Sequence, residues 1–231
     1  MDESNELAAS WLDLYDWRQR VAKIYRDRNV AWQAGEDEAR VFTSFRVERD
    51  ALFALHPQSP LSVEAQRSFS GLHYFPHNPA FKIEATLEPD SSGEPLAFDN
   101  GNEAMALRPA ARLRCTVEGS AVQLTVYWIA AYGGGLFLPF RDATCSDQSY
   151  GGGRYLFDTV KGSDFLRLDR TANTPLDALR RPGYPGGQVV VDFNYAYNPS
   201  CAYDVRWVCP LAPRENWLPM PIRAGELRFH D

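Results

Sequence analysis

Positive charge is scarce in this sequence relative to negative charge. The 231 residues include 24 Lys and Arg against 30 Asp and Glu, which gives a formal net charge of −6 at pH 7 and a pI of about 5.3. Proteins that bind nucleic acid or an anionic membrane surface do so through a basic face. We therefore expect neither nucleic acid nor membrane among the partners of this protein.

Long apolar runs and a basic, apolar leader are also missing. No window approaches the ~18 uninterrupted apolar residues of a membrane-spanning helix. The first residues, MDESNE, are acidic and polar, whereas a secretory leader begins basic and then turns apolar. These absences predict a soluble, cytoplasmic protein. Because 45% of its residues are hydrophobic, the chain can bury a sizeable core.

Histidine and cysteine occur only four times each, and their spacing does not suit a metal site. Zinc ligands usually come as two closely spaced pairs, but seven residues separate Cys201 from Cys209, and positions 79–228 contain no histidine. A nucleophilic Cys201 would need a histidine base, which only His73 or His77 could provide. We expect free thiols, no bound metal and no cofactor.

The signature motifs of three common enzyme classes are absent. The glycine run at 151–153 lacks the Gly-Lys-Ser/Thr ending of a P-loop and the spacing of a dinucleotide-binding fingerprint. No nucleotide binding is therefore predicted. The Gly-x-Ser-x-Gly elbow is also missing, which excludes a standard α/β-hydrolase.

Hydrophobic periodicity predicts a helical N-terminal part followed by short strands. Apolar residues recur at helical spacing from Leu7 to Tyr25, with Gly35 as a stop, and a second helix is predicted from Glu36 to Leu55. A single helical turn is predicted at 63–67. After Phe69 the pattern alternates as in strands. The predicted strands are 81–87, 105–107, 111–118, 121–129, 136–140, 154–157 and 188–193, with a short helix at 175–181 and short strands in the last forty residues.

These elements predict a mainly β fold of the α+β class. We expect an antiparallel open barrel or sandwich with two N-terminal helices. No linker divides the sequence, so residues 1–231 are expected to form a single domain. Within it, residues 1–60 would form a helical arm packed on a β-rich body at 69–231.

Seven long motifs resemble those of one uncharacterised prokaryotic family. They are ERDALFALHPQSPL (48–61), FSGLHYFP (69–76), LPFRDAT (138–144), SYGGGRYL (149–156), DFNYAYNPSCAY (192–203), CPLAPREN (209–216) and IRAGEL (222–227). The family is catalogued as domain of unknown function 1684, and the resemblance covers nearly the whole chain after Trp17. It implies a soluble, single-domain, β-rich protein of bacterial or archaeal origin and no established activity. The chain departs from the family pattern at Cys145 and Gln148, which makes both poor candidates for a shared role.

Two chemically dense stretches, 136–158 and 192–216, lead to a functional hypothesis. Both combine arginine, aspartate and tyrosine with tight turns, and we expect them to converge on a pocket for a small anionic ligand. Arginines would hold the charge, aromatic rings including Trp207 would form the walls, and polar groups would orient the ligand. The predicted ligand-binding residues are Arg141, Asp142, Tyr150, Arg154, Tyr155, Asp192, Asn194, Tyr197 and Cys201.

Two other hypotheses stay open from the sequence. The first is a hydrolase-type enzyme that uses Cys201 or a pair of carboxylates from among Asp142, Asp192, Glu215 and Glu226. The second is a structural or interaction domain in which the same residues brace the fold, since buried polar groups must find partners. The sequence identifies no catalytic residue, no specific ligand and no oligomeric state.

Overall fold

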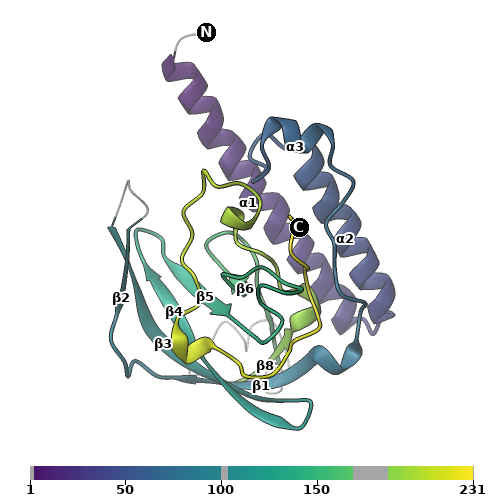
Figure 1. Cartoon of the computed structure of the whole chain (residues 1–231), viewed down its shortest axis with the longest axis vertical. Helices are drawn as coiled ribbons and strands as arrows, with labels where there is room; N and C mark the ends of the chain where they lie inside the picture. The colour runs from purple at the N-terminus through teal and green to yellow at the C-terminus, as the bar shows by residue number, and fades with distance from the viewer. Residues whose placement is uncertain (1–2, 100–103, 169–186, 231) are drawn as a thin grey trace, which may run out of the picture.

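The structure is a computed structural model, and it describes residues 3–99, 104–168 and 187–230. Two long helices at the N-terminus lie side by side along a curled antiparallel sheet that forms a half-barrel (Figure 1). The predicted fold class is therefore confirmed. The elements are α1 (Glu3–Gln33), α2 (Glu38–Leu55), α3 (Val63–Arg67), β1 (Lys82–Pro89), β2 (Leu96–Asp99), β3 (Ala104–Val117), β4 (Ser120–Ala130), β5 (Gly135–Phe140), β6 (Arg154–Asp158), β7 (Leu166–Arg167) and β8 (Gly187–Asp192).

Helix α1 has one buried stripe in its C-terminal half. Its buried residues recur every three or four positions, which is the spacing of one helical face, and they are Val21, Ile24, Tyr25, Arg28 and Trp32. The N-terminal half of α1 extends past the rest of the molecule (Figure 1), and apolar side chains there are exposed. No helix in the described ranges is long and apolar enough to cross a membrane.

Helix α2 begins at Glu38, two residues after the predicted start at Glu36, and ends at Leu55 as predicted. The Asp37 carboxylate accepts a hydrogen bond from the Arg40 backbone N–H at 2.8 Å, which caps the first turn. The helix ends at Leu55, two residues before a proline. Its inner face packs with α1, Val190 and Tyr195 in one apolar cluster, so the two helices are fixed against strand β8, next to the β7 edge of the sheet.

The sheet has the strand order β6-β5-β4-β3-β1-β8-β7, with β2 paired to β3. Every pair is antiparallel. The two strands predicted at 105–107 and 111–118 are one continuous strand, β3, whose register with β4 shifts between Pro109 and Ala111. Proline cannot donate to the ladder, so the strand continues through a bulge. Strands β2 and β7 were not predicted, and the predicted helix at 175–181 lies outside the described residues.

The C-terminal tail, yellow in Figure 1, runs between the sheet and the helices. The prediction of short strands there is wrong for the described residues after Asp192, which contain 3₁₀ turns and isolated bridges instead. Side chains attach the tail to the sheet: the buried Asn216 amide bonds the backbone of Thr125 at 2.7 and 2.8 Å and the Pro139 carbonyl at 2.8 Å. The prolines of the tail lack the N–H groups that a ladder needs, so polar side chains position it.

Candidate functional site

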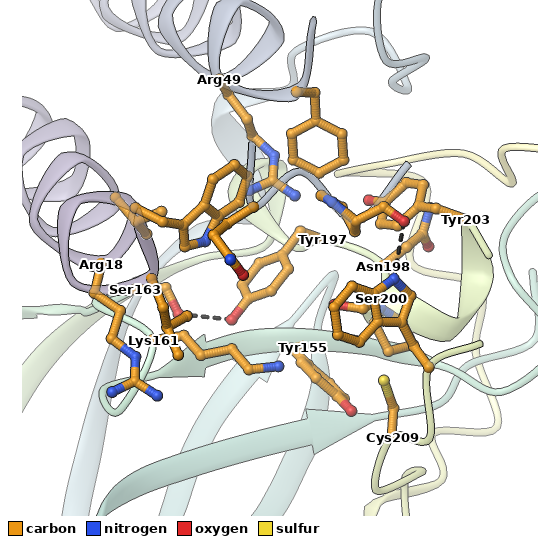
Figure 2. Close-up of a pocket in the computed structure, with 18 of the residues that line it drawn as sticks. Arg18, Arg49, Tyr155, Lys161, Ser163, Tyr197, Asn198, Ser200, Tyr203 and Cys209 are labelled. Carbon is orange, nitrogen blue, oxygen red and sulfur yellow. Dashed lines mark hydrogen bonds between the residues drawn. The ribbon is translucent and has the colours of Figure 1, made fainter. Parts of the chain in front are cut away.

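A cavity of about 240 Å³ lies where α1, the turn after β6 and the tail meet. For comparison, a cavity of roughly 150 Å³ can hold benzene. Most of the walls are aromatic or aliphatic, and Figure 2 shows the polar side chains that project among them. The lining residues are Leu14, Trp17, Arg18, Val21, Tyr25, Arg49, Phe53, Gln58, Pro60, Tyr155, Lys161, Ser163, Tyr197, Asn198, Pro199, Ser200, Tyr203, Trp207, Val208 and Cys209.

A tight turn directly after β6 brings Lys161 to the cavity. The Asp158 carboxylate accepts hydrogen bonds from the backbone N–H groups of Val160 and Lys161 at 3.1 and 3.3 Å. Gly162 has φ +90° and lies so close to α1 that a Cβ there would come within 2.9 Å of α1 backbone atoms. Only glycine accommodates both that φ and that approach. The turn therefore packs against α1, and the Lys161 amine extends toward the centre of the lining side chains (Figure 2).

The cavity is electropositive. Arg18 and Lys161 are exposed at its rim, and neither has an ion-pair partner in the described part of the chain. Arg49 projects into the group of lining side chains from α2 (Figure 2). No Asp or Glu side chain is among the described lining residues. The charge that faces an occupant is therefore positive on balance.

Arg49 is held by a buried carboxylate behind the wall. Its Nη2 lies 2.8 Å from Oε1 of Glu226, which is only 1% exposed. Glu226 also accepts hydrogen bonds from the hydroxyls of Tyr74 and Tyr203 and from the Asn198 N–H. Burial alone would lower the pKa of Arg49, but the Glu226 carboxylate raises it well above its usual value. This network fixes three lining residues, since Arg49, Asn198 and Tyr203 all attach to Glu226.

Two buried polar atoms of the lining residues have no hydrogen-bond partner within the described residues: Asn198 Oδ1 and the Tyr25 hydroxyl. The Asn198 Nδ2 donates to the Leu227 carbonyl at 2.7 Å, so the amide orientation is fixed and its oxygen is the free acceptor. Burial raises the pKa of Tyr25 to about 12, which keeps its hydroxyl a neutral donor. Unpaired buried polar atoms are costly, and both atoms belong to residues that line the cavity.

The two dense stretches of the sequence meet at this cavity. Tyr155 of β6 and Tyr197 of the tail exchange both backbone hydrogen bonds, at 2.8 and 3.0 Å, and their rings are 5.8 Å apart. The Tyr197 hydroxyl bonds Ser163 Oγ at 2.7 Å (Figure 2). The Tyr155 hydroxyl donates to the Pro210 carbonyl at 2.5 Å. Two predicted ligand-binding residues, Tyr155 and Tyr197, thus line the cavity, as does Trp207.

Arg154 and Asp142 lie together inside the protein and not among the cavity lining. Both side chains are fully buried, with Nη2 of Arg154 2.8 Å from Oδ2 of Asp142. The guanidinium also donates to the carbonyls of Ile222, Ala224 and Glu226. The other Asp142 oxygen accepts from the Ile222 N–H at 3.0 Å. This pair connects β6 to the tail, and its predicted part in ligand binding stays a prediction.

The five remaining predicted residues also lie outside the cavity lining. The Asp192 carboxylate accepts from the backbone and side chain of Asn194, whose amide bonds the backbone of Asn78. Burial raises the pKa of Asp192. Arg141 stacks on the Trp217 ring at 4.6 Å. Tyr150 and Cys201 contact each other, with the hydroxyl 3.6 Å from the sulfur, and the Cys201 N–H donates to the sulfur of the lining residue Cys209.

Sequence reasoning missed the helical side of the cavity and its lysine. Trp17, Tyr25 and Arg49 lie on helices whose periodicity indicated only core packing, and Lys161 lies in a polar turn. One signal was available: Lys161 is one of three lysines in the chain and follows the first dense stretch directly. Within the described residues, no group of three or more His, Cys, Asp or Glu side chains could hold a metal ion.

Comparison with known proteins gives a family match without an activity. A family model described as "Protein of unknown function (DUF1684)" matches residues 67–227. The solution NMR structure of an uncharacterised protein from Haloarcula marismortui is similar, with 32% sequence identity and a TM-score of 0.55 over 80% of this chain and 91% of that one. No curated protein matches. The family model starts after α2, so the helical side of the cavity lies outside the matched region.

Proposed function

This chain belongs to the DUF1684 family of proteins of unknown function. Because the family supplies no activity, the proposal rests on the cavity: we propose that the protein binds a small anionic molecule with an apolar, ring-sized body in the cavity beside α1. The observation that carries the proposal is the composition of the lining. Aromatic rings form the walls, three cationic side chains lie among them, and no described lining residue is acidic. Apolar walls with a few placed polar groups are typical of small-molecule sites.

The charge balance favours an anion over a neutral or cationic ligand. Arg49 already forms an ion pair with Glu226, so the carboxylate largely compensates the charge of the guanidinium. Lys161 forms no ion pair in the described ranges, although the buried Asp158 carboxylate interacts with its charge, and its amine extends toward the centre of the lining side chains (Figure 2). An ammonium next to low-dielectric aromatic walls attracts an anion more strongly than one in open water. Lys161 would therefore hold the anionic group of the ligand.

The unpartnered Asn198 oxygen supports a second feature of the ligand. Because Asn198 Oδ1 is buried and has no partner in the described part of the chain, a bound N–H or O–H group would relieve its desolvation cost. The Tyr25 hydroxyl would donate to a ligand oxygen. A hydroxy-acid or an amide-bearing acid with an aromatic body would satisfy both atoms and the lysine charge.

Benzoate and benzamide form a matched pair of probes for this proposal, since they share a ring and differ in charge. We expect benzoate to bind the full chain and to show saturation-transfer NMR signals, with benzamide at least several-fold weaker. Replacing Lys161 by methionine should weaken benzoate binding about tenfold, the effect of one charge-assisted contact, and leave benzamide unchanged. The K23M variant is the control, because Lys23 is exposed on α1 and pairs with Asp27.

Two results would contradict the proposal. One is equal binding of benzoate and benzamide to the wild-type chain, because the cavity would then not select charge. The other is an equal loss of benzoate affinity in K161M and K23M, because the effect would then come from overall charge and not from the cavity.

A further inference from the structure

Cys201 and Cys209 are brought together by a short loop next to the cavity. Cys201 lies in a 3₁₀ turn at Ser200–Ala202, and Cys209 precedes Pro210. The backbone N–H of Cys201 donates to the Cys209 sulfur at 3.3 Å. Both cysteines are free, and both residues are partly exposed.

The surroundings of the two sulfurs are different. A hydrogen bond with the Cys209 side chain, together with one from the Tyr150 hydroxyl, lowers the pKa of the Cys201 thiol to about 6. The same contact with Cys201, together with burial, raises the pKa of Cys209. The Lys161 charge favours the thiolate at both positions. These shifts favour Cys201 as the nucleophilic thiolate at neutral pH and Cys209 as its protonated neighbour.

We propose that Cys201 and Cys209 are a dithiol–disulfide site that reacts with low-molecular-weight disulfides. The Cys201 thiolate attacks one sulfur of the reagent, which forms a mixed disulfide and releases one thiolate. Cys209 passes its proton to that thiolate and attacks the Cys201 sulfur. The intramolecular disulfide forms, and the second reagent thiolate leaves and takes up a proton from solvent. The protein loses two electrons, and the reagent is reduced to two thiols.

The other two cysteines lack this arrangement. Cys115 lies on β3, and burial raises the pKa of its thiol to about 11. Cys145 contacts the Ser149 hydroxyl at 3.7 Å, and no described contact joins it to another cysteine. Both can therefore be replaced by serine without removing either member of the site.

The disulfide site would also affect the cavity, because Cys209 and three residues of the loop that it closes, Tyr203, Trp207 and Val208, are lining residues. Its existence does not depend on ligand binding. A loop with its ends joined has fewer accessible conformations, so oxidation would restrict one wall. The reduced and oxidised forms are thus two states of the same wall.

The test uses the full chain with C115S and C145S. After incubation with excess glutathione disulfide at pH 7, free thiols are trapped with iodoacetamide, and the protein is measured by intact mass and peptide mapping. We expect loss of both thiols and a cross-linked peptide joining 201 to 209. In the C209S variant a glutathione adduct should remain on Cys201. In C201S the adduct on Cys209 should form more slowly than the Cys201 adduct in C209S, because burial still raises the pKa of Cys209 when its contact with Cys201 is gone.

The pH dependence gives a readout that does not depend on disulfide formation. The alkylation rate of Cys201 in the folded protein should rise with pH through a midpoint near pH 6. In urea, the midpoint for the same cysteine should move to the ordinary thiol pKa of ~8.5. Two outcomes with the C115S/C145S protein would overturn the proposal. One is that both thiols stay free after treatment of the folded protein with glutathione disulfide, and the other is a stable glutathione adduct on Cys201 with Cys209 left free. Equal adduct rates in C201S and C209S would also overturn it.

Discussion

At the scale of single residues, Arg154 is a fully buried charged group that is paired inside the protein. It is 0% exposed and bonds Asp142 and the tail carbonyls. Removing one partner of a buried ion pair leaves the other charge unpaired, so we expect R154L to lower the free energy of unfolding by about 3–5 kcal/mol. The measurement is urea unfolding followed by circular dichroism. R154K, which keeps the charge but loses the planar fork, should lose less.

The control for that prediction is R141L. Arg141 comes from the same motif, but it is partly exposed and stacks on Trp217, so its removal should cost about 1 kcal/mol or less. Equal losses in R154L and R141L would contradict the bracing role of Arg154. Benzoate affinity of folded R154K separates the two roles that the sequence allows, because a brace changes stability and a ligand-binding residue changes affinity.

The same scale shows why the site could be only partly predicted. Tyr155 and Tyr197 belong to dense motifs and line the cavity, and their predicted part in ligand binding stays a prediction. The motif arginines and carboxylates could equally be ligand contacts or internal braces, because burial depends on packing that a sequence does not show. Lys161 lies outside both dense stretches, and Asn198 lies inside a motif in which nothing singled it out. Their position at the cavity comes from a glycine that fits against α1 and from a buried carboxylate that fixes the tail.

At the scale of elements, the turn after β6 joins the sheet to α1. We expect G162A to be destabilised by more than ~1 kcal/mol, because alanine adds the strain of positive φ and its Cβ would come within 2.9 Å of the Arg18 carbonyl and the Ala22 N–H. Benzoate binding should weaken as well, since the turn carries Lys161. Thermal unfolding and the NMR titration measure the two effects.

A substitution at a second glycine distinguishes the effect of backbone strain from the effect of close packing on α1. Gly133 has φ +70° and open space where a Cβ would lie, so G133A carries the strain alone and should lose less stability, with benzoate affinity unchanged. If G162A matched G133A in both measurements, the close packing of the turn on α1 would not matter for the site.

Prediction of elements from the sequence succeeded where a pattern is local. The two helices, the hairpin from β3 to β4 and the strands β1, β5, β6 and β8 follow from spacing and turn residues. The residues of β3 were predicted as two strands, 105–107 and 111–118, whereas the structure continues one strand through a bulge between Pro109 and Ala111. The tail was misassigned because prolines and long-range side-chain bonds, such as those of Asn216, determine its path. Such bonds are not visible in a local pattern.

At the scale of the whole molecule, the cavity joins parts that are far apart in sequence. Its walls come from α1 and α2, from the turn after β6 and from residues 197–209 of the tail. A ligand that touches all three stabilises the state in which they are assembled. It should therefore slow local opening on both the helical and the tail sides, and not on one side alone.

Hydrogen exchange of the full chain tests this coupling. With saturating benzoate, we expect slower amide exchange both in the α1 segment 14–25 and in the tail segment 197–209, and no change in β2, which contributes no lining residue. Benzamide should give a smaller effect, and K161M should give little effect at the same benzoate concentration. Protection limited to the tail would mean that the ligand does not contact the helices. The helical wall would then be part of the core packing and not of the binding site.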